Sequence, residues 1–293
     1  MIQTRIGVLG ATSMVGGCLL PALTASGAQV VAFSRNLSRS TQHGVRWVQL
    51  GAIAPTIAPA APVHHWISLA PIWALPEHFA LLQAHNARRV VVLSSTSVFT
   101  KQGSTDPQEQ AVAQRLADAE KCISDWAYSH GVEWVMLRPT LIYGLGLDKN
   151  VSEIARFVRR FGFFPVFGKA AGLRQPIHVA DVADVASACV ASLKAPVAMN
   201  RAYNLSGGET LSYRDMVQRV FAALGRPVRL LPVPLWAFEL AVSVLRLLPK
   251  YRQWSSAMAE RMNQDLVFSH AEAEQAFGFK PRPFVLAQAD LPP

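Results

Sequence analysis

Residues 5–27 read RIGVLGATSMVGGCLLPALTASG, and the rest of the chain is organised around them. The apolar run at residues 6–9 predicts a short buried strand, and a helical pattern follows it without a linker. A strand that turns directly into a helix aims unpaired backbone N–H groups and the positive helix end at one spot, which favours a phosphate there. Gly10 permits the tight turn and Gly16 lets the helix lie close to the strand, as in a dinucleotide-binding turn.

Ser13 stands where the middle glycine of this spacing usually lies, so the motif is degenerate. A serine there either narrows the approach of a pyrophosphate or offers it a hydroxyl donor. An ordinary strand-to-helix turn that binds no nucleotide is the alternative. We expect the cofactor contacts of this turn to come from Gly10, Thr12, Ser13, Met14, Val15 and Gly16.

The composition predicts a folded protein with a large interior. The chain has 293 residues, of which 51% are hydrophobic and 16% charged, so two domains or one core with an added lobe are expected. Three scattered cysteines fit no metal-binding or redox spacing, so we expect no metal site and reduced thiols in a cytoplasmic protein.

The net charge of +9 suggests an anionic partner, namely phosphates, an acidic surface or nucleic acid. No interleaving of aromatic and basic residues supports nucleic acid. The start of the chain lacks a signal-peptide pattern, and the apolar stretch at 235–248 contains Glu239 and Arg246 and is too short to span a bilayer. No transmembrane segment is therefore expected, and a helix packed on a second lobe is favoured over a membrane-surface helix.

Strand and helix patterns alternate along the first half of the chain. Strands are expected at 29–33, 45–50, 66–71, 89–95 and 132–137, and helices at 76–86 and 110–130. This alternation predicts an α/β fold with a doubly wound parallel (Rossmann) sheet and a ligand at the carboxyl ends of the strands. Residues 177–193 are expected to form a strand and a helix that rejoin the sheet. The predicted domains are a dinucleotide-binding domain of residues 1–142 and about 176–205, and a substrate lobe of 143–175 and 206–293.

The end of the second strand carries Ser34 and Arg35, with Arg39 nearby, and no carboxylate. A carboxylate there would hold the ribose 2′-hydroxyl of NAD, whereas serine and arginine suit a 2′-phosphate. We therefore expect NADP, with NAD the less favoured cofactor; a solvated arginine loop is the alternative. The other strand ends add the expected cofactor contacts Leu69, Ala70, Pro71, Ser94 and Pro139.

Five stretches resemble one known family. They are LSSTSVF at 93–99, LRPTLIYGLG at 137–146, IHVADVA at 177–183, YNLSGG at 203–208 and FGFKP at 277–281. Together with the glycine turn, they resemble the extended short-chain dehydrogenase/reductases, the NAD-dependent epimerase/dehydratase family, over nearly the full length. The resemblance also implies that a homodimer can form through the helices flanking the sheet.

The resemblance assigns roles to single residues. It implies that Ser95 hydrogen-bonds the reacting hydroxyl or carbonyl and that the backbone from Pro139 borders the nicotinamide. Arg174 matches the arginine that grips the substrate diphosphate in sugar-nucleotide members, with a hinge-loop ion pair as the alternative. Asn150 lies on the loop at the cleft mouth and is expected to contact substrate. His178 and Asp181 are expected to hold the crossover between the lobes.

The catalytic pair of the family is missing. Its chemistry needs a tyrosine four residues before a lysine on one helix, and none of the five tyrosines here has lysine at that spacing. When residues 117–121 (ADAEK) are aligned with the acidic end of the family's helix, Val112 takes the tyrosine position and Leu116 takes the lysine position.

Two functions stay open. One is an NADP-dependent oxidoreductase or epimerase-like enzyme for a small phosphate-bearing substrate, in which Ser95 polarises a carbonyl and Tyr143 or water supplies the proton. The other is a non-catalytic NADP-binding sensor, scaffold or assembly protein.

Overall fold

The structure is a computed structural model, and it describes residues 4–36, 44–51, 61–191, 199–234 and 260–293. Its centre is a seven-stranded sheet in the order β11-β6-β5-β4-β1-β2-β3, in which every neighbouring pair is parallel. The strands are β1 (Arg5–Leu9), β2 (Gln29–Ser34), β3 (Val45–Gln49), β4 (His65–Ser68), β5 (Arg89–Leu93), β6 (Glu133–Pro139) and β11 (Arg201–Leu205). The predicted parallel Rossmann sheet is confirmed.

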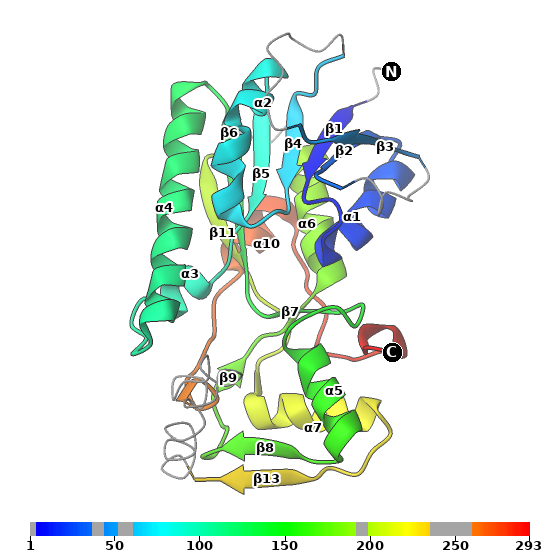
Figure 1. The fold of residues 1–293 in the computed structure, drawn as a ribbon, viewed down its shortest axis with the longest axis vertical. Helices are drawn as coiled ribbons and strands as arrows, with labels where there is room; N and C mark the ends of the chain where they lie inside the picture. Colours follow the sequence, from blue (N-terminus) through cyan, green and yellow to red (C-terminus); the bar gives the residue numbers. More distant parts are fainter. Residues whose placement is uncertain (1–3, 37–43, 52–60, 192–198, 235–259) are drawn as a thin grey trace.

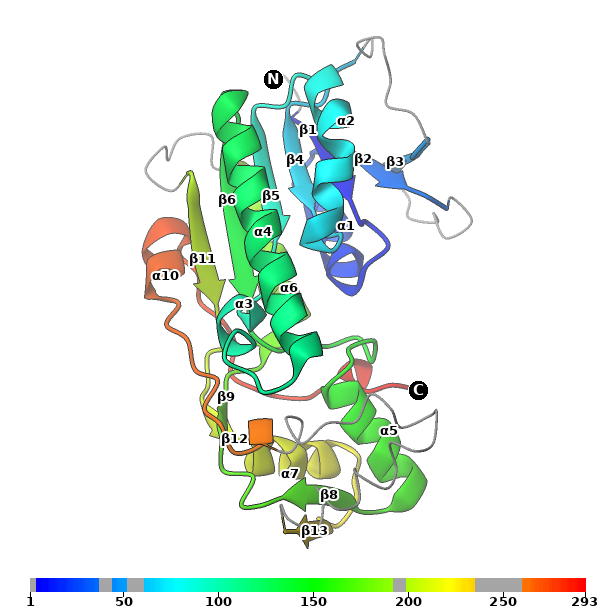
Figure 2. The same ribbon diagram turned by 60° about the vertical axis from the view of Figure 1, so that its left-hand side comes forward.

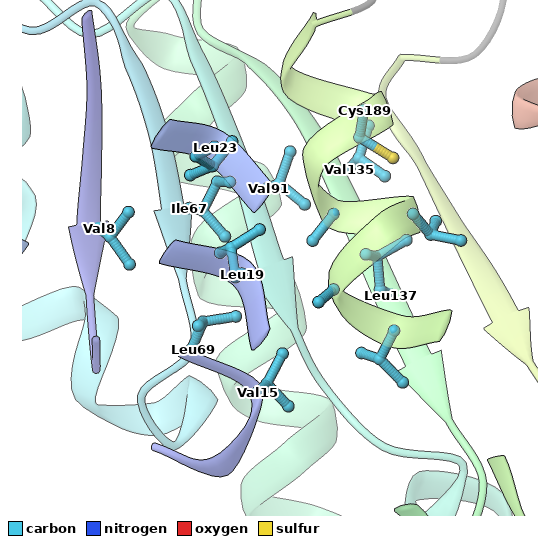
Figure 3. Close-up of a cluster of buried hydrophobic side chains, with 14 of the residues drawn as sticks. Val8, Val15, Leu19, Leu23, Ile67, Leu69, Val91, Val135, Leu137 and Cys189 are labelled. Carbon is cyan, nitrogen blue, oxygen red and sulfur yellow. The ribbon is translucent and has the colours of Figure 1, made fainter. Parts of the chain in front are cut away.

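Helices cover both faces of this sheet (Figures 1 and 2). One face is covered by α1 (Met14–Ala25), α6 (Val179–Ala191) and α10 (Ala271–Phe277). The other is covered by the 3-10 helix η2 (Ile72–His78), α2 (Phe79–Ala84) and α4 (Pro107–Ser129). Figure 3 shows the core of the first face, where Leu19 and Leu23 of α1 lie over Ile67 and Val91 of the sheet.

Two local predictions differ from the structure. Pro76 was expected to begin a helix, and it lies instead inside η2, whose tighter turn ends where α2 begins. The strand expected at residue 177 does not rejoin the main sheet. It is the two-residue β10 (Ile177–His178), which pairs with β7 (Ile142–Tyr143) and is short because α6 begins at the next residue, Val179. β11 takes the outer position of the main sheet, beside β6.

A smaller lobe lies beyond the carboxyl ends of the strands (Figure 1). It contains α5 (Val151–Phe161), α7 (Tyr213–Ala223) and two strand pairs, β8 (Phe164–Phe167) with β13 (Leu230–Val233) and β9 (Leu173–Arg174) with β12 (Leu211–Ser212). Its own hydrophobic core includes Val158, Phe221 and Phe284, which are separate from the core around the sheet. The division into a dinucleotide-binding domain and a substrate lobe stays a prediction.

The register of the sheet brings the strand ends to one edge. Leu9 at the end of β1 lies opposite Phe33 and Ser68, and Leu205 lies opposite Pro139. The turns after these strands therefore face the smaller lobe.

Among the described residues, no helix is long and apolar enough to cross a membrane. The apolar stretch at 235–248 lies outside the described residues.

Candidate functional site

The turn between β1 and α1 is held by its own hydrogen bonds. The Ser13 N–H donates to the Gly10 carbonyl (3.0 Å), and the Ser13 hydroxyl accepts from the Gly16 N–H (3.2 Å) as the N-cap of α1. Gly10 has a φ of 71°, a left-handed conformation that favours glycine. Ser13 therefore begins the helix, and its hydroxyl has a structural task.

The two outer glycines of this turn are required by close packing. A Cβ on Gly10 would lie 2.7 Å from the carbonyl carbon of Leu69, and one on Gly16 would lie 2.7 Å from that of Ala11. Both contacts are with backbone, which cannot move aside cheaply. Gly17, the next residue, would meet only the end of the Leu145 side chain, at 3.6 Å. Gly10 thus makes the turn, and Gly16 packs on the backbone of the turn itself, at Ala11. The cofactor contacts predicted for both glycines stay predictions.

Backbone donors gather at the start of α1. The N–H groups of Ala11, Thr12, Met14 and Val15 have no hydrogen-bond acceptor in the part of the chain that the structure describes. Ala11 and Val15 are buried, so their donors need a partner other than bulk water. Unpaired donors at a helix N-terminus suit phosphate oxygens. The turn therefore fits the pyrophosphate of a dinucleotide.

The neighbouring strand ends complete this side of the site. The Ser34 hydroxyl is buried and donates to the Asn36 carbonyl (2.8 Å), so it shapes the turn after β2. Arg35 beside it is exposed, and Arg39 lies outside the described residues. After β4, the Leu69 N–H donates to the Leu9 carbonyl (2.9 Å), and backbone atoms of Leu69 and Ala70 lie directly against Gly10. Pro71 follows them as the N-cap of η2.

Three consecutive hydroxyls follow β5, and they differ in their partners. The buried Ser94 donates to Glu120 Oε1 (2.6 Å), and Thr96 donates to the Pro139 carbonyl (3.2 Å). The Ser95 Oγ accepts from the Ser97 N–H (3.1 Å), and its own proton has no acceptor among the described residues. Ser95 is thus oriented by the backbone and keeps a proton that it can donate to a ligand.

A buried ion pair supports this edge from α4. Arg138 of β6 makes two hydrogen bonds to the Glu120 carboxylate, from Nε to Oε1 (2.8 Å) and from Nη2 to Oε2. The Arg138 guanidinium also lies 5.0 Å from the centre of the Phe99 ring. This ion pair was not predicted from the sequence. The signal available in the sequence was the placing of Glu120 four residues after Leu116, on the same helix face.

Val112 and Leu116, the positions that the family resemblance predicts for the tyrosine and the lysine, carry apolar side chains in apolar surroundings. Leu116 is buried in the core between α4 and the sheet, and Val112 is half-buried against the same core. No proton donor or cation is therefore offered by these two side chains.

Tyr143 lies in the interior of the smaller lobe. Its ring packs edge-on against His178 and Phe284, and its hydroxyl donates to the Val285 carbonyl (3.4 Å). Burial, together with the Asp290 carboxylate, raises the pKa of Tyr143 to about 12. A group with that pKa is poorly matched to proton transfer near neutral pH. Its catalytic role stays a prediction, and this placement offers it no support.

Arg174 is buried and uses its guanidinium internally. Nη1 donates to the carbonyls of Leu173 and Gln264, both at 2.7 Å, and Nη2 donates to the carbonyl of Arg261. Burial lowers the pKa of Arg174 to about 10, which still leaves it charged at neutral pH. These bonds join β9 to the later segment 261–264, so its expected contact with a substrate phosphate stays a prediction.

The remaining predicted contacts also have local partners. Asp148 accepts from the N–H groups of Asn150 (2.8 Å) and Ser152 (3.1 Å), which sets the start of α5 with Asn150 exposed at its N-cap. His178 lies 3.0 Å from the Asp290 carboxylate, and Asp181 accepts from Arg282 Nε at 2.7 Å. These last two pairs connect the crossover helix α6 to the end of the chain.

The parallel sheet with helices on both faces defines a Rossmann-type fold, and its first strand-end turn carries the unpaired backbone donors. Residues 79–206, less than half of the chain, match the model of the NAD dependent epimerase/dehydratase family. The match agrees with the family resemblance predicted from the sequence.

The chain is also similar to curated relatives and to solved structures. The chain is 26% identical over 165 residues to UDP-glucose 4-epimerase of Vibrio cholerae, covering 56% of this chain and 47% of that protein. It is 28% identical over 151 residues to (4-alkanoyl-5-oxo-2,5-dihydrofuran-3-yl)methyl phosphate reductase of Streptomyces griseus, covering 51% and 47%. It thus spans about half the length of these two curated relatives.

The structure of UDP-glucuronic acid 4-epimerase of Bacillus cereus in complex with NAD has the same fold, with a TM-score of 0.70, 14% identity and coverage of 98% and 95%.

Proposed function

We propose that the chain is an NADP-dependent oxidoreductase that reduces a carbonyl group of a small phosphate-bearing substrate. The observation that carries the proposal is the contrast among the hydroxyls after β5. Ser94 and Thr96 donate to protein acceptors, and Ser95 alone of the three has a proton without an acceptor in the described chain. It stands at the same sheet edge as the donors of residues 11–15.

Each part of the proposed site would have one role in the reduction. The N–H groups of Ala11, Thr12, Met14 and Val15 would hold the pyrophosphate, and a bound nicotinamide would supply the hydride. Ser95 would donate a hydrogen bond to the substrate carbonyl oxygen and stabilise the negative charge that develops there. Val112 and Leu116 carry no acidic proton, and the Tyr143 side chain points into the lobe core. Water is therefore the proposed proton donor.

The preference for NADP rests on Arg35. It is exposed directly after β2, next to a turn that the buried Ser34 holds in place, and the described residues 34–36 include no carboxylate. A cation at this strand end favours the extra phosphate of NADP. The choice of a phosphate-bearing substrate is supported by the net charge of +9 and by the phosphate and nucleotide groups in the names of the two relatives.

The test begins with binding. NADPH and NADH are titrated against protein fluorescence, and turnover is then measured with sugar nucleotides, phosphorylated ketones, aldehydes and quinones. We expect NADPH to bind and at least one carbonyl compound to be reduced. Ser95→Ala should lower kcat/KM by on the order of 10²-fold without changing NADPH affinity, because one donor to the developing oxyanion is lost. Ser129→Ala, which removes a hydroxyl from the far end of α4, is the matched control. Absence of binding by either cofactor at millimolar concentration would contradict the proposal.

A second function is favoured by one specific observation. Leu116 is sealed in the hydrophobic core where the family places a lysine, so the site can bind a cofactor without the usual proton-transfer pair. This is expected of an NADP-binding sensor, scaffold or assembly protein. Loss of an acid/base group costs a factor of about 10²–10⁴ in rate, so slow reduction can survive it. Tight NADPH binding with no turnover on any carbonyl substrate would favour the second function.

A further inference from the structure

Among the described residues, the free end of the smaller lobe includes parts of two segments without acidic residues. Neither residues 154–180 nor residues 216–234 contain Asp or Glu, although both contain several arginines. The strands β8 and β13 pair in parallel, and the Phe164 N–H donates to the Arg229 carbonyl (2.9 Å). Arg226 Nη1 also donates to the Val158 carbonyl (2.9 Å), which ties the second segment to α5. The two segments therefore form one surface.

We call this surface the lobe tip. It lies at the end of the molecule farthest from the α2 end of the sheet, where β13, β8 and the end of α5 gather in Figures 1 and 2. Its exposed members include these apolar and cationic residues: Arg160, Phe161, Phe163, Arg226, Val228, Arg229 and Leu231.

Large apolar side chains are unusually open at the lobe tip. Phe161 is 50% exposed, Leu231 50%, Val228 49% and Phe163 36%. The two phenylalanines are held in place by Phe157, whose ring centre lies 4.6 Å from that of Phe161 and 5.8 Å from that of Phe163. Phe161 and Phe163 are therefore fixed by packing against Phe157, and both remain exposed to solvent. Grouped exposed apolar residues of this kind mark interaction sites.

The cations of the lobe tip have no acidic partners. The Arg160 guanidinium lies 5.2 Å from the centre of the Phe161 ring. Neither Arg160, Arg226 nor Arg229 forms an ion pair with any residue in the described ranges. The lobe tip therefore exposes positive charge beside apolar side chains, and its two segments contain no carboxylate that could neutralise that charge.

We infer that the lobe tip docks the protein onto an anionic membrane surface. Phenylalanine and aliphatic side chains can enter the boundary between headgroups and acyl chains, while arginines remain at the level of the lipid phosphates. Nucleic acid would satisfy the arginines, but it would leave Val228 and Leu231 in water. The lobe tip faces away from the glycine turn of α1 in Figure 1, so docking leaves that turn uncovered.

The inference is tested by co-sedimenting the full chain with vesicles. One set is phosphatidylcholine, and the other contains about 30% phosphatidylserine, which gives the negative surface potential that attracts basic residues. The charge variant is Arg160→Gln with Arg229→Gln, and the apolar variant is Phe161→Ser with Phe163→Ser. The matched controls are Arg88→Gln with Arg201→Gln, exposed at the other end of the strands, and Tyr128→Ser, an exposed ring on α4.

We expect binding to the phosphatidylserine vesicles and much weaker binding to phosphatidylcholine alone. The charge variant should weaken binding by on the order of twentyfold, since each arginine near such a surface contributes about fivefold. The apolar variant should weaken it by about tenfold or more. The controls should bind as the unchanged protein does, and thermal melting checks that every variant is folded.

Three outcomes would overturn the inference. The first is no association with the phosphatidylserine vesicles. The second is an equal loss of binding in the lobe-tip variants and in their controls. The third is equally tight binding to polyglutamate or duplex DNA that the Phe161→Ser and Phe163→Ser pair leaves unchanged, because an acidic protein or a nucleic acid would then be the partner.

Discussion

The turn at residues 10–16 and the α4 segment at residues 112–120 border the same sheet edge, and they are built in different ways. The turn works through its backbone, with glycines at two close contacts and donors that point outward from a helix start. The α4 segment works through side chains, and here those are Val112, Leu116 and the paired Glu120.

This difference explains how a protein can keep dinucleotide binding and lose proton transfer. A backbone cradle tolerates many side-chain changes, because only the glycines are constrained by packing. Proton transfer depends on particular functional groups at particular helix positions, so one apolar replacement removes it. The proposed dinucleotide site is thus formed by backbone, whereas Val112 and Leu116 of α4 carry no group that could transfer a proton.

The largest expected effect comes from the turn. Gly16→Val should lower the free energy of unfolding by about 3 kcal/mol and abolish NADPH binding, since its Cβ would run into the Ala11 backbone. Urea unfolding and fluorescence titration measure both. Gly17→Ala is the control, and it should be neutral or stabilise by up to about 1 kcal/mol. Equal tolerance of both changes would show that the turn is less constrained than its geometry indicates.

The buried ion pair of α4 comes next. Glu120→Ala should lower the free energy of unfolding by about 2 kcal/mol, because it leaves Arg138 and the Ser94 hydroxyl without their acceptor. Denaturant unfolding gives the value. Asp125→Ala breaks the exposed pair with Lys121 on the same helix and should cost less than about 0.5 kcal/mol. Similar losses in the two variants would count against a special role for Glu120.

The cofactor preference gives a smaller effect. Arg35→Glu should weaken NADPH binding about tenfold, or roughly 1.4 kcal/mol, and leave NADH binding unchanged or improved, because a carboxylate repels the 2′-phosphate and suits a ribose hydroxyl. Paired titrations with the two cofactors measure the change. Arg88→Glu, an exposed charge reversal at the opposite ends of the strands, is the control. A parallel decrease for NADPH and NADH would contradict the assignment.

The smallest effect is expected at Tyr143. Tyr143→Phe removes a long hydrogen bond to the carbonyl of the exposed Val285, which water can replace, so the free energy of unfolding should fall by less than about 1 kcal/mol. Turnover should stay unchanged if water is the proton donor. A drop in kcat of about 10²-fold with normal stability would instead restore Tyr143 as the catalytic acid.

Much of the fold followed from local patterns. The strands at β1, β2 and β5 are short apolar runs, and the alternation with helices indicated a parallel sheet before any contact was known. The outer strand β11 was not expected because RAYNL mixes polar and apolar residues. Its place beside β6 depends on pairing across distant parts of the chain, which no local pattern contains.

The candidate site could be predicted in outline only. The positions of Gly10, Gly16 and Ser95 followed from turn chemistry and from the family resemblance. The inward placement of Tyr143 and two of the three carbonyl partners of Arg174 come from contacts with residues 261–290, which are more than 80 positions away. Sequence spacing cannot show such partners, because it does not say which segment covers a side chain.

By itself, the sequence determined the apolar strands, the glycines that a tight strand-to-helix turn requires, and the absence of a tyrosine-lysine pair, since these depend on residue type and spacing along one segment. The tertiary structure decided which hydroxyl keeps a proton to donate and which arginines are buried or exposed. Those properties depend on what lies across from each side chain, and only the packing of distant segments sets that.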